Sequence, residues 1–230
     1  GVNAGPAASE AARLACAELR RPKDAHELEL MGQAVRATVA GYARLPDLLR
    51  PGVTERTLPL ELEAAFQRAG ADRTGYGTIV GTGPNAAVLH FEPSTRAVAA
   101  GDFVLVDAGA EVDRYVADVT RTHVAGHPTG FQRDLHQAVV RTLDRAIARC
   151  VPGAEWKAIH LAAAVDLAEG LVAMNVMRGN PTELVERDAH ALFFPHGVGH
   201  MLGLGVRDAS GRALGRAKDP RPSLRSLRMD

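Results

Sequence analysis

The stretch DFVLVDAGAEVDRYVADVTRTH, residues 102–123, predicts a β-hairpin. Residues 103–106 form an apolar run, and residues 115–120 form a second run that contains β-branched and aromatic side chains. The segment between them, residues 108–114, is small and polar, as turn regions are. The hairpin is the feature from which the rest of the chain is interpreted.

Two carboxylates of the hairpin face each other if its turn centres on Val112 and Asp113, because Asp107 then lies opposite Asp118. Like charges directly opposite each other destabilise a sheet. Either one carboxylate is protonated, or the register differs, or a cation lies between them. Two carboxylates at this spacing suit a pair of divalent ions about 3.5–4 Å apart. The simpler interpretation is that one aspartate ends a strand and faces water.

Composition excludes several classes of protein. The 230 residues, 46% of them hydrophobic, are enough for one large domain or two small ones with a core. Basic and acidic residues are equal at 27 each, which gives no electrostatic reason to expect nucleic acid or a membrane as partner. No apolar run approaches the roughly 18–20 residues of a bilayer span, and no signal-peptide pattern is present. Cys16 and Cys150 are isolated, which favours a reducing, cytoplasmic setting.

Helices are expected on both sides of the hairpin. Asp24 followed by Glu27 predicts a capping box, and an apolar stripe from Leu28 to Leu45 predicts a helix that ends near residue 50. Further helices are predicted over residues 58–70, from 129 to about 150, and over 156–171, the last two followed by another strand. This order indicates an α+β fold with two similar halves, although no sequence repeat accompanies it.

A glycine-rich segment, residues 75–93, precedes the hairpin and lacks the spacing of a phosphate-binding loop. It is predicted to form two short strands, residues 78–80 and 88–91, with His90 on the second. A single histidine in such a place is more often structural than functional.

A second candidate for chemistry is FFPHGVGHMLGLGVRD, residues 193–208, in which His196 and His200 lie four residues apart. The glycines between them favour a loop or strand end over a helix. The zinc-protease pattern requires a glutamate directly after the first histidine, and Gly197 occupies that place. The simpler interpretation assigns the glycines to tight packing and one histidine to a core hydrogen bond.

Together these segments resemble the metallopeptidases of the pita-bread fold: methionine aminopeptidase, aminopeptidase P and prolidase. The resemblance covers about residues 22–208 and rests on four segments in family order: the opening RPKDAHELELM helix, VLHFEPS, DAGAEVDRYVADVTRT and HGVGHMLGLGVRD. The spacing of Asp107 and Asp118 is that of the aminopeptidase P and prolidase branch, and bacterial Xaa-Pro peptidases are the most similar members. The fold implied is α+β, with two pseudo-two-fold halves around a curved, mainly antiparallel sheet.

The resemblance implies a role for each residue. Asp107, Asp118 and His200 would be metal ligands for two divalent ions, with Mn²⁺ favoured by the carboxylate-rich donor set and Zn²⁺ or Co²⁺ as alternatives. A hydroxide bridging the metals would attack the peptide bond before proline. His196 would hydrogen-bond the substrate or the tetrahedral intermediate. His90 would bind substrate or deliver a proton to the leaving nitrogen.

This sequence departs from the family pattern in three ways. The two further glutamate ligands of the family are not in it, so residues 22–230 are expected to be a catalytic domain without its last strands. Arg207 stands where many relatives have histidine, and an arginine suits substrate binding rather than proton transfer. Residues 1–21 are expected to be a linker or the end of an N-terminal domain that precedes this sequence.

The function expected is hydrolysis of the bond before proline by an Xaa-Pro aminopeptidase or dipeptidase, acting on small proline-containing peptides as a cytoplasmic homodimer. The alternative is a non-catalytic module of the same fold that binds a peptide or partner. Intact ligands at Asp107 and Asp118 favour the enzyme, and they also disfavour a metal-free creatinase-like hydrolase.

Overall fold

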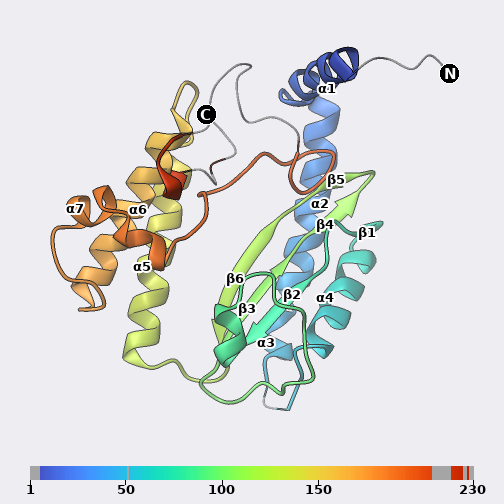
Figure 1. Ribbon diagram of the computed structural model, residues 1–230. Coiled ribbons are helices and arrows are strands. Elements are labelled where there is room, and N and C mark those ends of the chain that lie inside the picture. The colour runs from blue at the N-terminus through green and yellow to red at the C-terminus, as the bar shows by residue number, and fades with distance from the viewer. Residues whose placement is uncertain (1–5, 51, 209–218, 225–226, 228–230) are drawn as a thin grey trace. The chain divides into compact units, whose positions relative to one another are not determined.

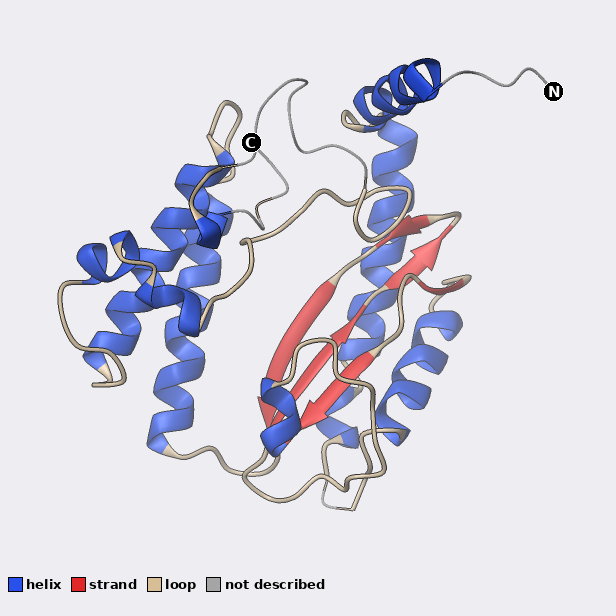
Figure 2. Ribbon diagram, in the orientation of Figure 1, coloured by secondary structure: helices blue, strands red, loops and turns tan. Residues whose placement is uncertain are grey.

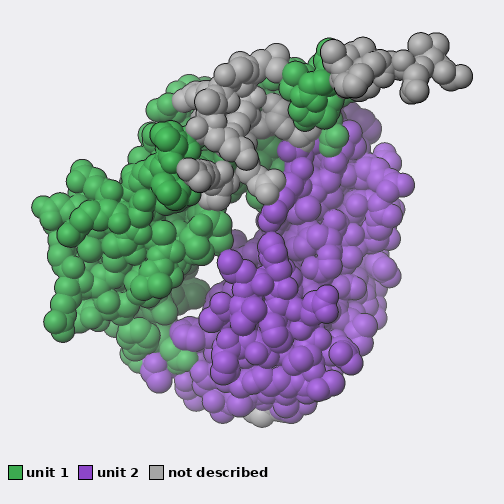
Figure 3. Space-filling view, in the orientation of Figure 1, with its two compact units in different colours: residues 1–21, 130–201, 209–230 green, residues 22–129, 202–208 purple. Residues whose placement is uncertain are grey.

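The computed structural model describes residues 6–50, 52–208, 219–224 and 227, with side chains from residue 10 onward. The chain forms two compact units, shown in different colours in Figure 3. Unit 1 comprises residues 1–21, 130–201 and 209–230, and unit 2 comprises residues 22–129 and 202–208. Each unit is described by itself below.

Unit 2 contains the sheet strands of the described part of the chain (Figures 1 and 2). Its elements in order are α2 (Ala25–Tyr42), α3 (Leu45–Leu48), α4 (Thr57–Arg68), β1 (Arg73–Thr74), β2 (Ile79–Thr82), the 3₁₀ helix η1 (Gly83–Ala87), β3 (Phe103–Ala108), β4 (Ala110–Val112), β5 (Tyr115–Val116) and β6 (Val119–Val124). The strands form two antiparallel sheets, with the orders β2-β3-β6 and β1-β4-β5.

The predicted hairpin is present, but its predicted register is wrong. Strand β3 pairs with β6 so that Asp107 lies opposite Thr120, and β4 pairs with β5 so that Val112 lies opposite Tyr115. The turn therefore centres on Asp113 and Arg114, which both have positive φ, at 47° and 75°. Positive φ at both central residues matches the right-handed twist of the strands, and this tight turn moves the pairing by two residues.

Helix α2 begins where the sequence predicts, but it buries a different face. Asp24 and Glu27 form the predicted capping box. Leu28 and Val39 of the predicted apolar stripe are 56% and 59% exposed, whereas the buried positions are mostly small. The buried residues of α2 are Leu30, Ala34, Ala37, Thr38 and Gly41.

Small residues are required on this face because α2 and α4 pack closely. A Cβ atom at Gly41 would overlap the ring of Phe66 on α4. Leu58, Leu62 and Phe66 of α4 are fully buried in the same core as the strand residues Val104 and Val106. Helices α2 and α4 thereby cover one face of the strands (Figure 2). Helix α2 also ends at Tyr42 rather than near residue 50, and α3 follows it.

The segment after β2 differs from the prediction. Residues 83–87 form η1, and no strand is present at 88–91. His90 lies in a loop with φ of 52°, a left-handed conformation, so it is not at a strand end as predicted. The strand pattern of alternating side chains does not apply to a residue in a left-handed conformation.

Unit 1 is helical in its described residues. Its elements are α1 (Pro6–Arg20), α5 (Gly130–Ala148), α6 (Trp156–Ala173), α7 (Pro181–Glu186) and the 3₁₀ helices η2 (Ala189–Leu192) and η3 (Pro222–Leu224). The strand predicted after α6 is replaced by α7, because Asn180 caps that helix and Pro181 occupies its first position. Cys16 and Cys150 are exposed and form no disulfide. Of the described helices, none is long and apolar enough to cross a membrane.

Candidate metal centre

Asp107 and Asp118 come together around one phenol group in unit 2. Tyr76, three residues before β2, donates its hydroxyl to Oδ1 of Asp107 at 2.6 Å and lies 3.1 Å from Oδ1 of Asp118. Asp107 is in β3, and Asp118 lies in the short link between β5 and β6. The hairpin therefore brings both predicted carboxylate ligands together, although they are not paired directly across the strands.

The environment of Asp107 makes its ionised form costly. Burial is the main effect that raises the pKa of Asp107, and the nearby charge of Asp118 raises it further. Hydrogen bonds from Tyr76 and Thr120 and the charge of His90 act in the opposite direction but do not outweigh the burial. A carboxylate pair of this kind is stabilised by a positive charge placed beside it.

Tyr76 was not among the residues predicted from the sequence. Burial raises the pKa of its phenol, and the two aspartates raise it further, so Tyr76 remains a hydrogen-bond donor. The segment that carries it packs tightly, since a Cβ at Gly75 would overlap Val116 of β5. The GYG pattern at residues 75–77 is the signal that could have indicated this close approach.

A second tyrosine, Tyr42, links α2 to strands β3 and β6 near Asp107. The hydroxyl of Tyr42, at the end of α2, lies 2.5 Å from the carbonyl oxygen of Val119 and accepts a hydrogen bond from the backbone N–H of Ala108 at 3.2 Å. It also lies 3.1 Å from the carbonyl oxygen of Val106. Tyr42 thus joins the helix to both strands next to Asp107.

His90 belongs to the same unit as the carboxylates. It is exposed, and its electrostatic interaction with Asp107 lowers the pKa of that carboxyl group. The imidazole is therefore exposed in a surface loop of the unit that contains both carboxylates.

His196 and His200 belong to unit 1, and a hydrogen bond to a backbone carbonyl orients each ring. In each ring Nδ1 donates to the next carbonyl oxygen, that of Gly197 at 3.2 Å and that of Met201 at 3.0 Å. In a neutral ring this bond places the lone pair on Nε2, which is the arrangement found in metal-binding histidines. The ring of His196 also contacts Phe194 edge-on, with centroids 5.6 Å apart.

Arg207 is exposed and lies in the short segment 202–208 that belongs to unit 2. The next residue, Asp208, forms an ion pair with Lys23 at 2.8 Å, and the two side chains are only 1% and 7% exposed. This buried pair ties the segment to the start of α2. The segment also meets β5 through the bridge between Leu204 and Tyr115.

The described residues contain no cluster of three or more histidine, cysteine or acidic side chains in metal-binding geometry. The structure groups two of the three predicted ligands, and the third, His200, lies in the other unit. The two carboxylates nevertheless suit divalent ions, because a buried, mutually repelling pair of oxygen donors is what a hard cation stabilises.

The sequence matches a family of metallopeptidases, which supports a metal centre at the two carboxylates. Residues 29–225 match metallopeptidase family M24, and the chain belongs to this family. It is 34% identical to the Xaa-Pro aminopeptidase of Escherichia coli over 192 residues, which are 83% of this chain and 44% of that protein. It is 33% identical to the Xaa-Pro dipeptidase of Shewanella amazonensis over 196 residues, which are 83% of this chain and 43% of that protein.

Solved structures give the same result. Aminopeptidase PepP of Pseudomonas aeruginosa superimposes with a TM-score of 0.82 at 32% identity, covering 90% of this chain and 47% of that one. An Escherichia coli aminopeptidase P variant in complex with substrate gives a TM-score of 0.84 at 32% identity, covering 89% and 46%. The predicted α+β pita-bread fold is thereby confirmed. The chain spans less than half the length of these relatives.

Proposed function

We propose that the protein is a metal-dependent peptidase that hydrolyses the peptide bond before proline. The observation that carries this proposal is the pair Asp107 and Asp118 gathered around Tyr76 in a member of family M24. The relatives named above are Xaa-Pro aminopeptidases and an Xaa-Pro dipeptidase, which supports the substrate class.

Asp107, Asp118 and Nε2 of His200 would hold two divalent metal ions, with Mn²⁺ preferred because most donors are carboxylate oxygens. Bound divalent ions would supply Lewis acidity, which lowers the pKa of a water molecule and polarises the substrate carbonyl. A zinc-substituted Escherichia coli aminopeptidase P is among the similar structures, so Zn²⁺ and Co²⁺ belong in the same metal titration.

The remaining predicted residues would handle the substrate. His90, exposed in the loop after η1, would bind the peptide or pass a proton to the leaving proline nitrogen. His196 would donate from Nε2 when protonated and stabilise the negative charge that develops on the carbonyl oxygen. Arg207 would clamp a substrate carboxylate through two parallel hydrogen bonds.

The test compares the intact protein with its Asp118→Ala variant in the presence of Mn²⁺, using Xaa-Pro peptides and the same peptides with alanine in place of proline. We expect hydrolysis of the proline peptides only, and its loss in Asp118→Ala. Asp144→Ala, an exposed aspartate on α5, is the matched control and should keep full activity. Undiminished activity in Asp118→Ala would contradict the proposal.

The subclass follows from substrate length. A dipeptidase cleaves Xaa-Pro but not longer peptides, whereas an aminopeptidase accepts both or prefers the longer ones. Comparing kcat/KM for a dipeptide and a tripeptide of the same first two residues therefore decides between them.

We also propose that the protein acts on small peptides in the cytoplasm as a homodimer. Exposed cysteines without a disulfide support a reducing compartment. Within it, residues 22–230 would belong to the catalytic domain and residues 1–21 to a linker or preceding domain. Sedimentation equilibrium of the intact protein would test the dimer, and a monomer at all concentrations would exclude it.

A further inference from the structure

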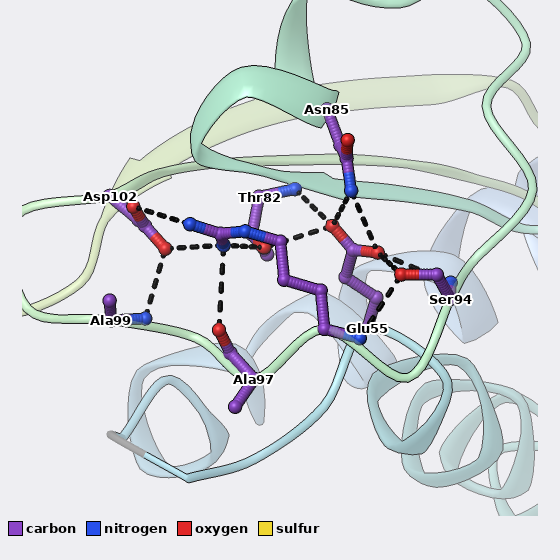
Figure 4. Close-up of polar contacts among 8 residues, drawn as sticks. Glu55, Thr82, Asn85, Ser94, Ala97, Ala99 and Asp102 are labelled. Carbon is purple, nitrogen blue, oxygen red and sulfur yellow. Dashed lines mark hydrogen bonds and ion pairs between the residues drawn. The ribbon is translucent and has the colours of Figure 1, made fainter.

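A carboxylate outside the candidate metal centre, that of Glu55, is buried with an exposed fraction of 0%. It precedes α4 and receives hydrogen bonds from three residues of another segment (Figure 4). Burial alone would raise the pKa of Glu55, but the bonds from Ser94, Asn85 and Thr82 outweigh this and lower it. Glu55 is therefore held as a charged, hydrogen-bonded group.

The donors to Glu55 lie on both sides of the loop that carries His90. Thr82, at the end of β2, donates its backbone N–H at 2.8 Å and its hydroxyl at 2.9 Å to Oε1. Asn85, in η1, donates to Oε1 at 3.0 Å. Ser94, four residues after His90, donates its hydroxyl at 2.5 Å and its backbone N–H at 3.2 Å to Oε2.

A backbone hydrogen bond and an ion pair also hold the base of this loop. The N–H of Arg56 donates to the carbonyl oxygen of Ser94 at 3.0 Å. The guanidinium of Arg96 contacts the hydroxyl of Thr82 and forms an ion pair with Asp102 at 2.6 Å. Figure 4 shows Thr82, Asn85, Ser94 and Asp102 as parts of one connected set of polar contacts around Glu55. One carboxylate thus holds both ends of the segment that contains His90.

We propose that Glu55 is a positioning residue for His90 and acts through the loop of residues 83–94. This inference rests on the proposed function, in which His90 contacts the substrate. The exposed, left-handed His90 lies between the points held by Glu55, at Asn85 and Ser94. Releasing either end would let the backbone that carries the His90 imidazole shift.

A carboxylate is required for this task, since a glutamine of equal size would place its own N–H₂ against a donor. The N–H of either Thr82 or Ser94 would then lose its acceptor and face a second hydrogen-bond donor. Because a displacement of about 1 Å in a reacting group can cost on the order of a hundredfold in rate, Glu55→Gln should lower kcat/KM by at least about tenfold.

The test is a double-mutant cycle on the intact protein with Mn²⁺ and an Xaa-Pro peptide. Glu55→Gln should lower kcat/KM in the wild-type background but by less than about twofold in a His90→Ala background, because a residue that acts through His90 has nothing left to position. Mn²⁺ affinity should stay unchanged. Equal fold losses in both backgrounds would show a general structural role and overturn the proposal.

The matched control is Glu111→Gln, the same substitution at another buried acid of unit 2. Glu111 forms an ion pair with Arg73 on β1 and is 8% exposed. If Glu55→Gln lowers the yield of folded protein, Ser94→Ala removes one of the hydroxyl donors and tests the same relation.

A second readout does not depend on activity. Amide hydrogen exchange of residues 82–94 should accelerate in Glu55→Gln and stay unchanged in Glu111→Gln, because the N–H groups of Thr82 and Ser94 are bonded to Glu55. Unchanged exchange would overturn the proposal. An intact protein that cleaves no Xaa-Pro peptide would contradict the proposed function alone, and the exchange measurement would then decide the role of Glu55 in holding the loop.

Discussion

Replacing Asp107 by asparagine should make the metal-free protein more stable while removing its metal site. Both carboxylates contact the Tyr76 hydroxyl, at 2.6 and 3.1 Å. Their oxygens therefore lie within about 6 Å, where two unit charges repel by about 3 kcal/mol at an effective dielectric constant of ~20. Partial exposure and a weaker hydrogen bond to the amide reduce the expected gain to about 1 kcal/mol.

The contribution of Asp107 to the stability of the metal-free protein changes with pH in a defined direction. The pKa of Asp107 is raised above its usual value of 3.8, so the folded protein binds this proton more readily than the unfolded chain. Wild-type protein without metal should therefore gain stability from this group as the pH falls from neutral through the raised pKa. The Asp107→Asn variant lacks this contribution and should show a smaller gain.

The assay is urea unfolding followed by circular dichroism, in chelator and in Mn²⁺, at pH 7 and pH 5. Mn²⁺ at about 100 times its Kd should stabilise the wild type by about 2.7 kcal/mol and the variant by much less, so the order of stability reverses on adding metal. Asp144→Asn is the control and should match the wild type. A metal-free Asp107→Asn protein that is less stable than wild type at pH 7 would refute the reasoning.

Three further predictions concern stability. Lys23→Met should cost about 3–5 kcal/mol in urea unfolding, because it removes the ammonium group that pairs with the buried carboxylate of Asp208, 1% exposed. Gly109→Ala should lower the melting temperature strongly, since a Cβ there would overlap a backbone carbonyl, whereas Gly77→Ala has open space and should not. His160, whose pKa burial lowers to about 4, should titrate near that pH by NMR, and His160→Phe should lessen the loss of stability between about pH 6.5 and 4.

Local signals in the sequence predicted much of unit 2. The hairpin, the capping box at Asp24 and the helix that ends before Gly70 depend on neighbouring residues, and each is present. The register of the hairpin was wrong because nothing local indicates that Asp113 and Arg114, neither of them glycine, adopt positive φ. Contacts elsewhere, such as that from Asp72 to the N–H of Asp113 at 2.7 Å, help to hold that turn.

Long-range packing accounts for the other errors. Apolar periodicity favours large side chains, so it selected Leu28 and Val39 over the small residues that α4 requires on α2. Tyr76 contacts Asp107, 31 residues away, and Glu55 contacts Thr82, 27 residues away. A single sequence does not show which distant residues are in contact. His90 was placed on a strand because its neighbours are apolar, although its backbone has a positive φ that strands do not use.

The turn at Asp113 and Arg114 has a practical consequence. Both residues carry a Cβ in a backbone region that asparagine and glycine occupy at lower cost, so the wild-type pair stores a small conformational penalty. An Asn-Gly pair at these positions would relieve it without touching any proposed ligand. The tip of the hairpin is thus a place where protein engineers can gain thermal tolerance in this scaffold and leave its chemistry alone.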